Sequence, residues 1–140
     1  QFRMALGARI FGCDDCLDAC PWNRFARASQ DANLRHRAAL DQPLRDFLRL
    51  ENAGFRELFR GSPILLAKRR GFLRNICVAL GNTGGADDLP ALRRAQDDPE
   101  PLIREHAAWA VDRIEAAAAA RSPSALLDRV EETRDRVVPR

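Results

Sequence analysis

The sequence contains no apolar run long enough to cross a membrane, and no charged start, apolar stretch and small-residue cleavage site mark a signal peptide. These absences predict a soluble, cytoplasmic protein without a membrane partner. Sustained apolar alternation is also missing, whereas Ala, Leu, Arg and Glu are abundant, so no segment predicts a β-strand. We therefore expect a mainly α-helical chain.

Methionine is nearly absent: the only one is Met4, and residue 1 is Gln. With 140 residues, the chain has the length of one ordinary domain. The start at a residue other than methionine predicts that the sequence is a fragment of a longer protein.

Cysteine is scarce, with four residues, but three of them form Cys13-x2-Cys16-x3-Cys20, followed directly by Pro21. This spacing is the second half of the bacterial run Cys-x2-Cys-x2-Cys-x3-Cys-Pro, whose fourth cysteine ligates the other cluster in two-cluster proteins. Ile10 stands where the run would have its first cysteine. The spacing therefore predicts two thiolates for one 4Fe-4S cluster, from Cys13 and Cys16, and one for a second cluster, from Cys20. The remaining ligands must come from elsewhere.

Two other uses of these cysteines, a zinc site and disulfides, fit the sequence less well. A structural zinc site normally has two separated Cys-x2-Cys pairs or one pair plus histidines, and neither His36 nor His106 has a partner at ligand spacing. A disulfide framework is typical of secreted chains rather than of a chain without a signal peptide. The fourth cysteine, Cys77, lies among apolar residues of an expected helix and is predicted to be a small buried thiol. His106 and Trp109 are predicted to pack a helix.

Charge is unevenly distributed along the chain, although the net charge is only +3. Residues 1–82 hold fourteen Lys/Arg against eight Asp/Glu, whereas residues 83–140 hold nine against twelve. Between residues 60 and 74 the charged residues are all basic: Arg60, Lys68, Arg69, Arg70 and Arg74. Such a patch can neutralise phosphates. Charge alone favours the alternative, a solvated helix face.

Helical periodicity follows the cysteine segment. Asp41 is predicted to cap a helix that has Pro43 in its first turn and ends near residues 52–54. A second short helix is predicted to place Phe55, Leu58 and Phe59 in the core. Further helices are expected over residues 63–80, which residues 81–85 would end, then over 90–96 and about 102–120. We expect the C-terminal half of a ferredoxin-like 4Fe-4S cysteine module in residues 1–30, a HEAT-like α-helical repeat domain in residues 31–120 and a charged tail in residues 121–140.

Several motifs together resemble one known family. Residues 12–23 read GCDDCLDACPWN, residues 59–64 read FRGSPI, residues 69–75 read RRGFLRN and residues 79–82 read ALGN. In sequence and in order they resemble epoxyqueuosine reductase, over roughly residues 5–115. The resemblance implies an oxidoreductase of queuosine biosynthesis that reduces epoxyqueuosine to queuosine at the tRNA wobble position, with cobalamin and two 4Fe-4S clusters. In that family the cobalamin fold and the general acid precede this segment, so no catalytic residue is expected here and the fragment alone should be inactive.

The resemblance also implies roles for individual residues. Cys13 and Cys16 would ligate the cluster nearer the cobalamin and Cys20 the other one. Pro21, Trp22 and Asn23 would line the cluster shell, although Trp22 could instead simply pack beneath the loop. The five basic residues of the 60–74 patch would hold tRNA.

The implied partners are tRNA and an electron donor of the reductase or flavodoxin type, for a monomeric protein. The alternative function is a generic 4Fe-4S electron-transfer protein whose helical scaffold binds a protein.

Overall fold

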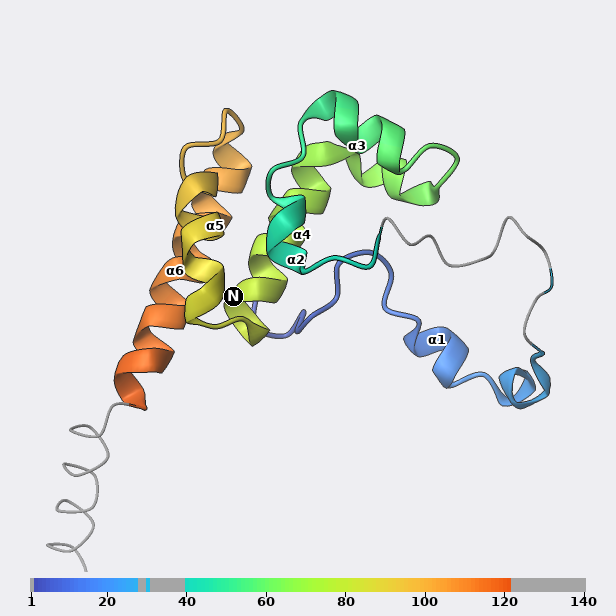
Figure 1. The fold of residues 1–140 in the computed structure, drawn as a ribbon. Helices are drawn as coiled ribbons and strands as arrows, with labels where there is room; N and C mark the ends of the chain where they lie inside the picture. The colour runs from blue at the N-terminus through green and yellow to red at the C-terminus, as the bar shows by residue number, and fades with distance from the viewer. Residues whose placement is uncertain (1, 28–29, 31–39, 122–140) are drawn as a thin grey trace, which may run out of the picture.

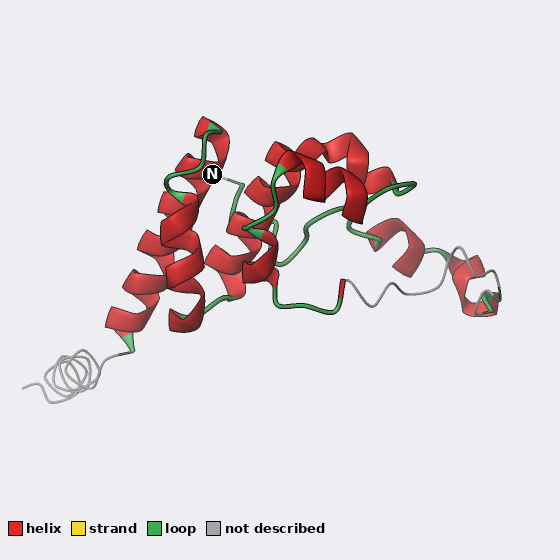
Figure 2. Cartoon of the chain, turned by 45° about the horizontal axis from the view of Figure 1, so that its top comes forward, coloured by secondary structure: helices red, strands yellow, loops and turns green. Residues whose placement is uncertain are grey.

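The computed structural model describes residues 2–27, 30 and 40–121, and this part of the chain contains helices and turns but no strand (Figures 1 and 2). The predicted tail from residue 122 onward lies outside the described residues. No described helix is both long and apolar enough to span a bilayer. In chain order the elements are α1 (Asp15–Asp18), the 3-10 helix η1 (Pro21–Phe25), α2 (Leu44–Phe47), α3 (Asn52–Leu58), the 3-10 helix η4 (Pro63–Ala67), α4 (Lys68–Thr83), the 3-10 helix η5 (Ala86–Asp88), α5 (Leu89–Ala95) and α6 (Pro101–Ala120).

The core lies between α4 and α6, with α5 packed on α6 and α2 packed on α4 (Figure 1). α1 and η1 project away from this helical block in both views (Figures 1 and 2). The apolar positions predicted for α5 and α6 are buried or partly buried as expected, and both helices lie close to their predicted ranges. The mainly helical class is confirmed, whereas the ferredoxin-like and HEAT-like descriptions stay predictions.

Four phenylalanines fill one end of the core. Phe72 of α4 lies 4.8 Å from Phe59, 5.7 Å from Phe55 and 5.9 Å from Phe47, measured between ring centroids. Tilted and edge-to-face contacts at these separations are favourable for aromatic rings. The predicted core role of Phe55 and Phe59 is confirmed, because both side chains are buried.

The first part of the helical block differs from prediction. α2 begins after Pro43, which is its N-cap in an extended conformation, so Asp41 is not the capping residue. Residues 52–54, predicted to end that helix, instead form the first turn of α3. The chain leaves α2 through i→i+3 bonds, among them Leu50 N–H to the Phe47 carbonyl at 3.0 Å, and the extended backbone of Glu51 then starts a new helix.

The predicted helix over residues 63–80 is divided and extended. Lys68, with φ 57° and ψ 161°, separates η4 from α4, because an α-helix cannot continue through that conformation. At the other end, Gly81 does not stop α4, which continues to Thr83. A Cβ on Gly81 would lie 2.5 Å from Trp109 Cζ3 and 3.1 Å from Ala110 Cα. Gly81 therefore serves the close approach of α4 to α6 rather than a helix end.

Candidate cluster-ligand loop and basic edge

The three clustered cysteines occupy one short loop. Cys13 lies in the turn before α1, Cys16 lies within α1, and Cys20 precedes η1. Gly12 and Asp14, on either side of Cys13, both have positive φ, 71° and 56°, which reverses the chain around this residue. All three thiols are free of disulfides; Cys13 and Cys16 are exposed and Cys20 is half-buried.

The donor set fits iron-sulfur ligation shared with other parts of a protein. Free, accessible thiols are the ligands that 4Fe-4S clusters use. Among the described residues, no group of three or more His, Cys, Asp or Glu side chains converges to hold a metal ion. The described residues therefore complete neither a zinc site, which would bring four ligands together, nor a cluster site. The two-plus-one division of Cys13, Cys16 and Cys20 between two clusters stays a prediction that this geometry allows.

The residues predicted to line the clusters form η1. Trp22 is 77% exposed, which does not support the alternative that it packs beneath the loop; its place in the cluster shell stays a prediction. The centroid of its ring lies 6.2 Å from that of Phe25, which is also exposed. The Arg24 guanidinium carbon lies over the Phe25 ring, 4.7 Å from its centroid. Asn23 N–H donates to the Cys20 carbonyl at 3.0 Å, which closes the turn after Pro21.

Cys77 and His106 are core residues, as the sequence predicts. Burial raises the pKa of the Cys77 thiol to about 12, and the Asp98 charge adds to this effect, so Cys77 does not supply a thiolate near neutral pH. The His106 Nδ1–H donates to the Leu102 carbonyl at 2.8 Å. Burial lowers the pKa of His106; the hydrogen bond to Leu102 opposes this change, but the net shift is downward.

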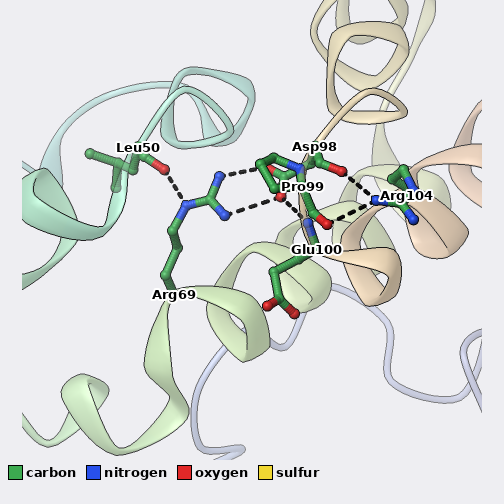
Figure 3. Close-up of polar contacts among 6 residues, drawn as sticks. All are labelled: Leu50, Arg69, Asp98, Pro99, Glu100 and Arg104. Atoms are coloured by element: carbon green, nitrogen blue, oxygen red, sulfur yellow. Dashed lines mark hydrogen bonds and ion pairs between the residues drawn. The ribbon is translucent and has the colours of Figure 1, made fainter.

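The predicted RNA-binding residue Arg69 is bonded to two other parts of the fold (Figure 3) and is largely withdrawn from solvent. Its Nε donates to the Leu50 carbonyl at 2.6 Å, and its two terminal nitrogens reach the Asp98 carboxylate at 3.1 and 2.5 Å. The two side chains are only 12% and 8% exposed. Arg69 thus joins the segment before α3 to the start of α4 and to the turn between α5 and α6.

Asp98 is the centre of that network (Figure 3). Its Oδ1 also accepts from the Glu100 N–H at 2.9 Å, and Arg104 donates to the carbonyls of Asp98 and Pro99 at 2.8 and 2.9 Å. Burial raises the pKa of the Asp98 carboxyl, but the hydrogen bonds from Arg69 and Glu100, together with the charges of Arg69 and Arg104, outweigh it and lower the pKa below 3.8. Because this shift is downward from the ordinary pKa of an aspartate, the carboxylate remains ionised and paired at neutral pH.

The other four basic residues differ in environment. Lys68 and Arg70 are exposed at the start of α4, and Arg60 is exposed and pairs with Glu57. Arg74 is half-buried and its Nε donates to Asn75 Oδ1 at 2.9 Å. The five residues are therefore not one uniform patch, and Lys68 and Arg70 are its most accessible members without a described internal role.

Sequence reasoning missed the part that Asn75 and Asn82 play. Both asparagines stand in the motifs quoted for the family resemblance, and both donate to the backbone of residues 3–10. The repeated Asn at the same helix face was the available signal, since residues seven apart lie two turns apart on an α-helix.

Comparison with known proteins finds relatives of one kind. No protein-family model matches the chain. A curated epoxyqueuosine reductase from Xanthomonas campestris pv. campestris is 42% identical over 113 residues, which is 79% of this chain and 32% of that protein. The chain is homologous to part of the epoxyqueuosine reductases. The reductase from Pseudomonas aeruginosa is 38% identical over 115 residues, covering 81% of this chain and 32% of the relative, and that of Escherichia coli K12 is 34% identical over 112 residues, covering 79% and 30%.

Solved structures agree with this assignment. A crystal structure of epoxyqueuosine reductase with a tRNA-Tyr epoxyqueuosine-modified tRNA stem loop superposes with a TM-score of 0.73 at 31% identity, over 81% of this chain and 31% of that one. A structure of the Bacillus subtilis epoxyqueuosine reductase gives a TM-score of 0.71 at 31% identity, with the same coverage. The chain spans about a third of the length of the epoxyqueuosine reductases that it matches.

Proposed function

We propose that this chain is the C-terminal part of an epoxyqueuosine reductase, which reduces epoxyqueuosine to queuosine at the wobble position of tRNA. The observation that carries the proposal is the 42% identity to a curated reductase over 79% of the chain. The match to a reductase bound to a tRNA stem loop supports a role next to RNA. In this proposal the chain supplies cluster ligands and an RNA-facing platform, while catalytic residues and the cobalamin site lie in the rest of the enzyme.

The cysteine loop is proposed to serve two clusters. Cys13 and Cys16 would hold one 4Fe-4S cluster and Cys20 a second one, completed by cysteines outside this chain. When bound, the clusters supply electrons to cobalamin, and a donor of the reductase or flavodoxin type would reduce them in the cytoplasm. Leu17, Trp22 and Phe25 are exposed around the loop. An exposed apolar surface of this kind supports a loop that other parts of the parent enzyme cover.

The RNA contacts are proposed for the accessible basic residues. Phosphate contacts position a nucleic acid without reading its sequence, and unpaired bases carry most of the information in RNA recognition. Lys68 and Arg70 are exposed at the start of α4 and would contact phosphates, together with Arg60 and Arg74. Arg69, in contrast, belongs to the internal ion pair, so we leave it out of the proposed interface.

Salt dependence of tRNA binding tests this proposal in the full-length parent enzyme. Each phosphate contact contributes about 0.7 to 0.9 to the slope of log affinity against log salt. Replacing both Lys68 and Arg70 with Gln is expected to reduce the slope by about 1.5 and to weaken binding about tenfold or more. Arg93→Gln is the matched control, because Arg93 is exposed but pairs with Glu115 on the α5–α6 side.

The outcomes separate the competing functions. An unchanged slope in the Lys68 and Arg70 variant would remove this edge from the RNA interface. If the parent enzyme held both clusters but bound tRNA at no salt concentration, the generic electron-transfer function would replace the reductase. If it bound tRNA and reduced epoxyqueuosine, the proposal would hold.

A further inference from the structure

Two asparagines of α4 share one face and one function in the fold. Asn75 and Asn82 lie seven residues apart, which is two helical turns, and both are half-buried. Asn75 Nδ2 donates to the Ile10 carbonyl at 2.6 Å. Asn82 Nδ2 donates to the carbonyls of Arg3 and Gly7 at 2.8 and 2.9 Å. Both amides thus bind the backbone of the segment that leads into the cysteine loop.

The bound segment is also attached through side chains. Arg3 forms an ion pair with Glu105 of α6 and lies over the Trp109 ring at 5.5 Å from its centroid. Ile10 packs against the edge of the core. Residues 3–10 are therefore anchored at both ends, by Asn82 and the α6 side chains at one end and by Asn75 at the other. Ile10, at the end of this stretch, lies three residues before Cys13.

The chemistry of these contacts requires an amide. The acceptors are backbone carbonyl oxygens, so the side chain must be a donor. The Asn82 amide nitrogen uses both of its hydrogens, and the Asn75 amide combines a donor toward Ile10 with an acceptor for Arg74. Arg74 Nε donates to Asn75 Oδ1, which occupies the amide oxygen and directs the Asn75 nitrogen toward Ile10. An Asp at either position would keep the shape but place a carboxylate oxygen against a carbonyl oxygen.

We propose that Asn75 and Asn82 are positioning residues that hold the cysteine loop in a fixed place on the helical domain. The proposal rests on the proposed function, because it assigns a purpose to this fixed placement. The clusters and the RNA bound to the helical domain must keep one geometry for reaction, and a displacement of about 1 Å can reduce a rate about 100-fold. Arg74 belongs to the same device, because it orients the Asn75 amide.

The test uses the full-length enzyme with Asn75→Asp and Asn82→Asp, singly and together. Asn52→Asp is the matched control, because Asn52 is exposed at the start of α3. Release of residues 3–10 is measured as trypsin cleavage after Arg9, followed by mass spectrometry. Each lost amide donor is expected to accelerate this cleavage about tenfold, because its loss leaves a backbone carbonyl of residues 3–10 without a hydrogen bond while the segment is docked.

Turnover separates positioning from simple docking. In the double variant we expect single-turnover epoxide reduction to fall at least tenfold, while iron content stays unchanged and tRNA affinity stays within about twofold. Arg3→Ala, which leaves α4 intact, provides a second variant if the double variant does not fold; it should raise cleavage after Arg9 in the same way. Unaccelerated cleavage, or accelerated cleavage with unchanged turnover, would overturn the proposal. A wild-type enzyme that binds no iron or reduces no epoxide would overturn the proposed function instead, and cleavage would still report the docking.

Discussion

The ion pair between Arg69 and Asp98 predicts a large effect of one substitution on folding. Arg69→Ala removes three hydrogen bonds, to Leu50 and to both Asp98 oxygens, and leaves the carboxylate without its main partner. Removing one member of a buried pair costs about 3–5 kcal/mol. The lower end, about 3 kcal/mol, applies here because Asp98 keeps the hydrogen bond from the Glu100 N–H.

Urea unfolding followed by circular dichroism measures this cost. A loss of about 3 kcal/mol in a domain of this size corresponds to a fall of more than about 10 °C in Tm. Arg93→Ala is the control. The side chains of Arg93 and its partner Glu115 are 59% and 47% exposed, so their ion pair should contribute no more than about 0.5 kcal/mol to stability. Arg69→Met combined with Asp98→Leu should be more stable than either single change, since no unpaired buried charge remains. Equal effects of Arg69→Ala and Arg93→Ala would refute the assignment of Arg69 to the fold.

Substitutions at three further positions test other features of the helical domain. Gly81→Ala should destabilise the domain by about 1 kcal/mol or more in urea unfolding, because the new methyl group meets Trp109 and the α6 backbone. This cost exceeds the gain in helix propensity, so a more stable variant would contradict the close packing. Lys68→Gly should stabilise the domain by about 1 kcal/mol, whereas Lys68→Ala should not, since only Gly adopts the Lys68 backbone conformation without strain. The lowered pKa of His106 means that protonation favours unfolding, so its contribution is complete above pH 6.5 and declines as the pH falls below that value; His106→Gln should flatten this part of the stability profile, and an unchanged profile would contradict the shift.

Local patterns predicted the elements whose causes are local. The helical periodicity around Phe55 and Phe59, the ranges of α5 and α6 and the buried position of Cys77 follow from neighbouring residues in the sequence. The cysteine spacing likewise indicates the candidate ligands, and the family motifs resemble those relatives that the comparison finds.

Features that depend on distant partners were not predictable in this way. Arg69 resembles its exposed neighbours in sequence, but Asp98, 29 residues away, binds it in the interior. Gly81 is a residue type that often ends helices, yet its role here is to let Trp109 of another helix pack closely. The exposure of Trp22 similarly depends on which other parts of the fold contact the cysteine loop, and the sequence of the loop does not determine those contacts.

Iron quantification in the full-length parent enzyme tests the central claim most directly. Cys13→Ala and Cys20→Ala should each lower the iron content by about one 4Fe-4S cluster, and the double variant should lower it by about two, because the two thiolates serve different clusters. Cys77→Ala should leave the iron content unchanged, since that thiol is buried in the core. A double variant that loses no more iron than either single variant, or a wild-type enzyme that binds zinc in place of iron, would contradict the account.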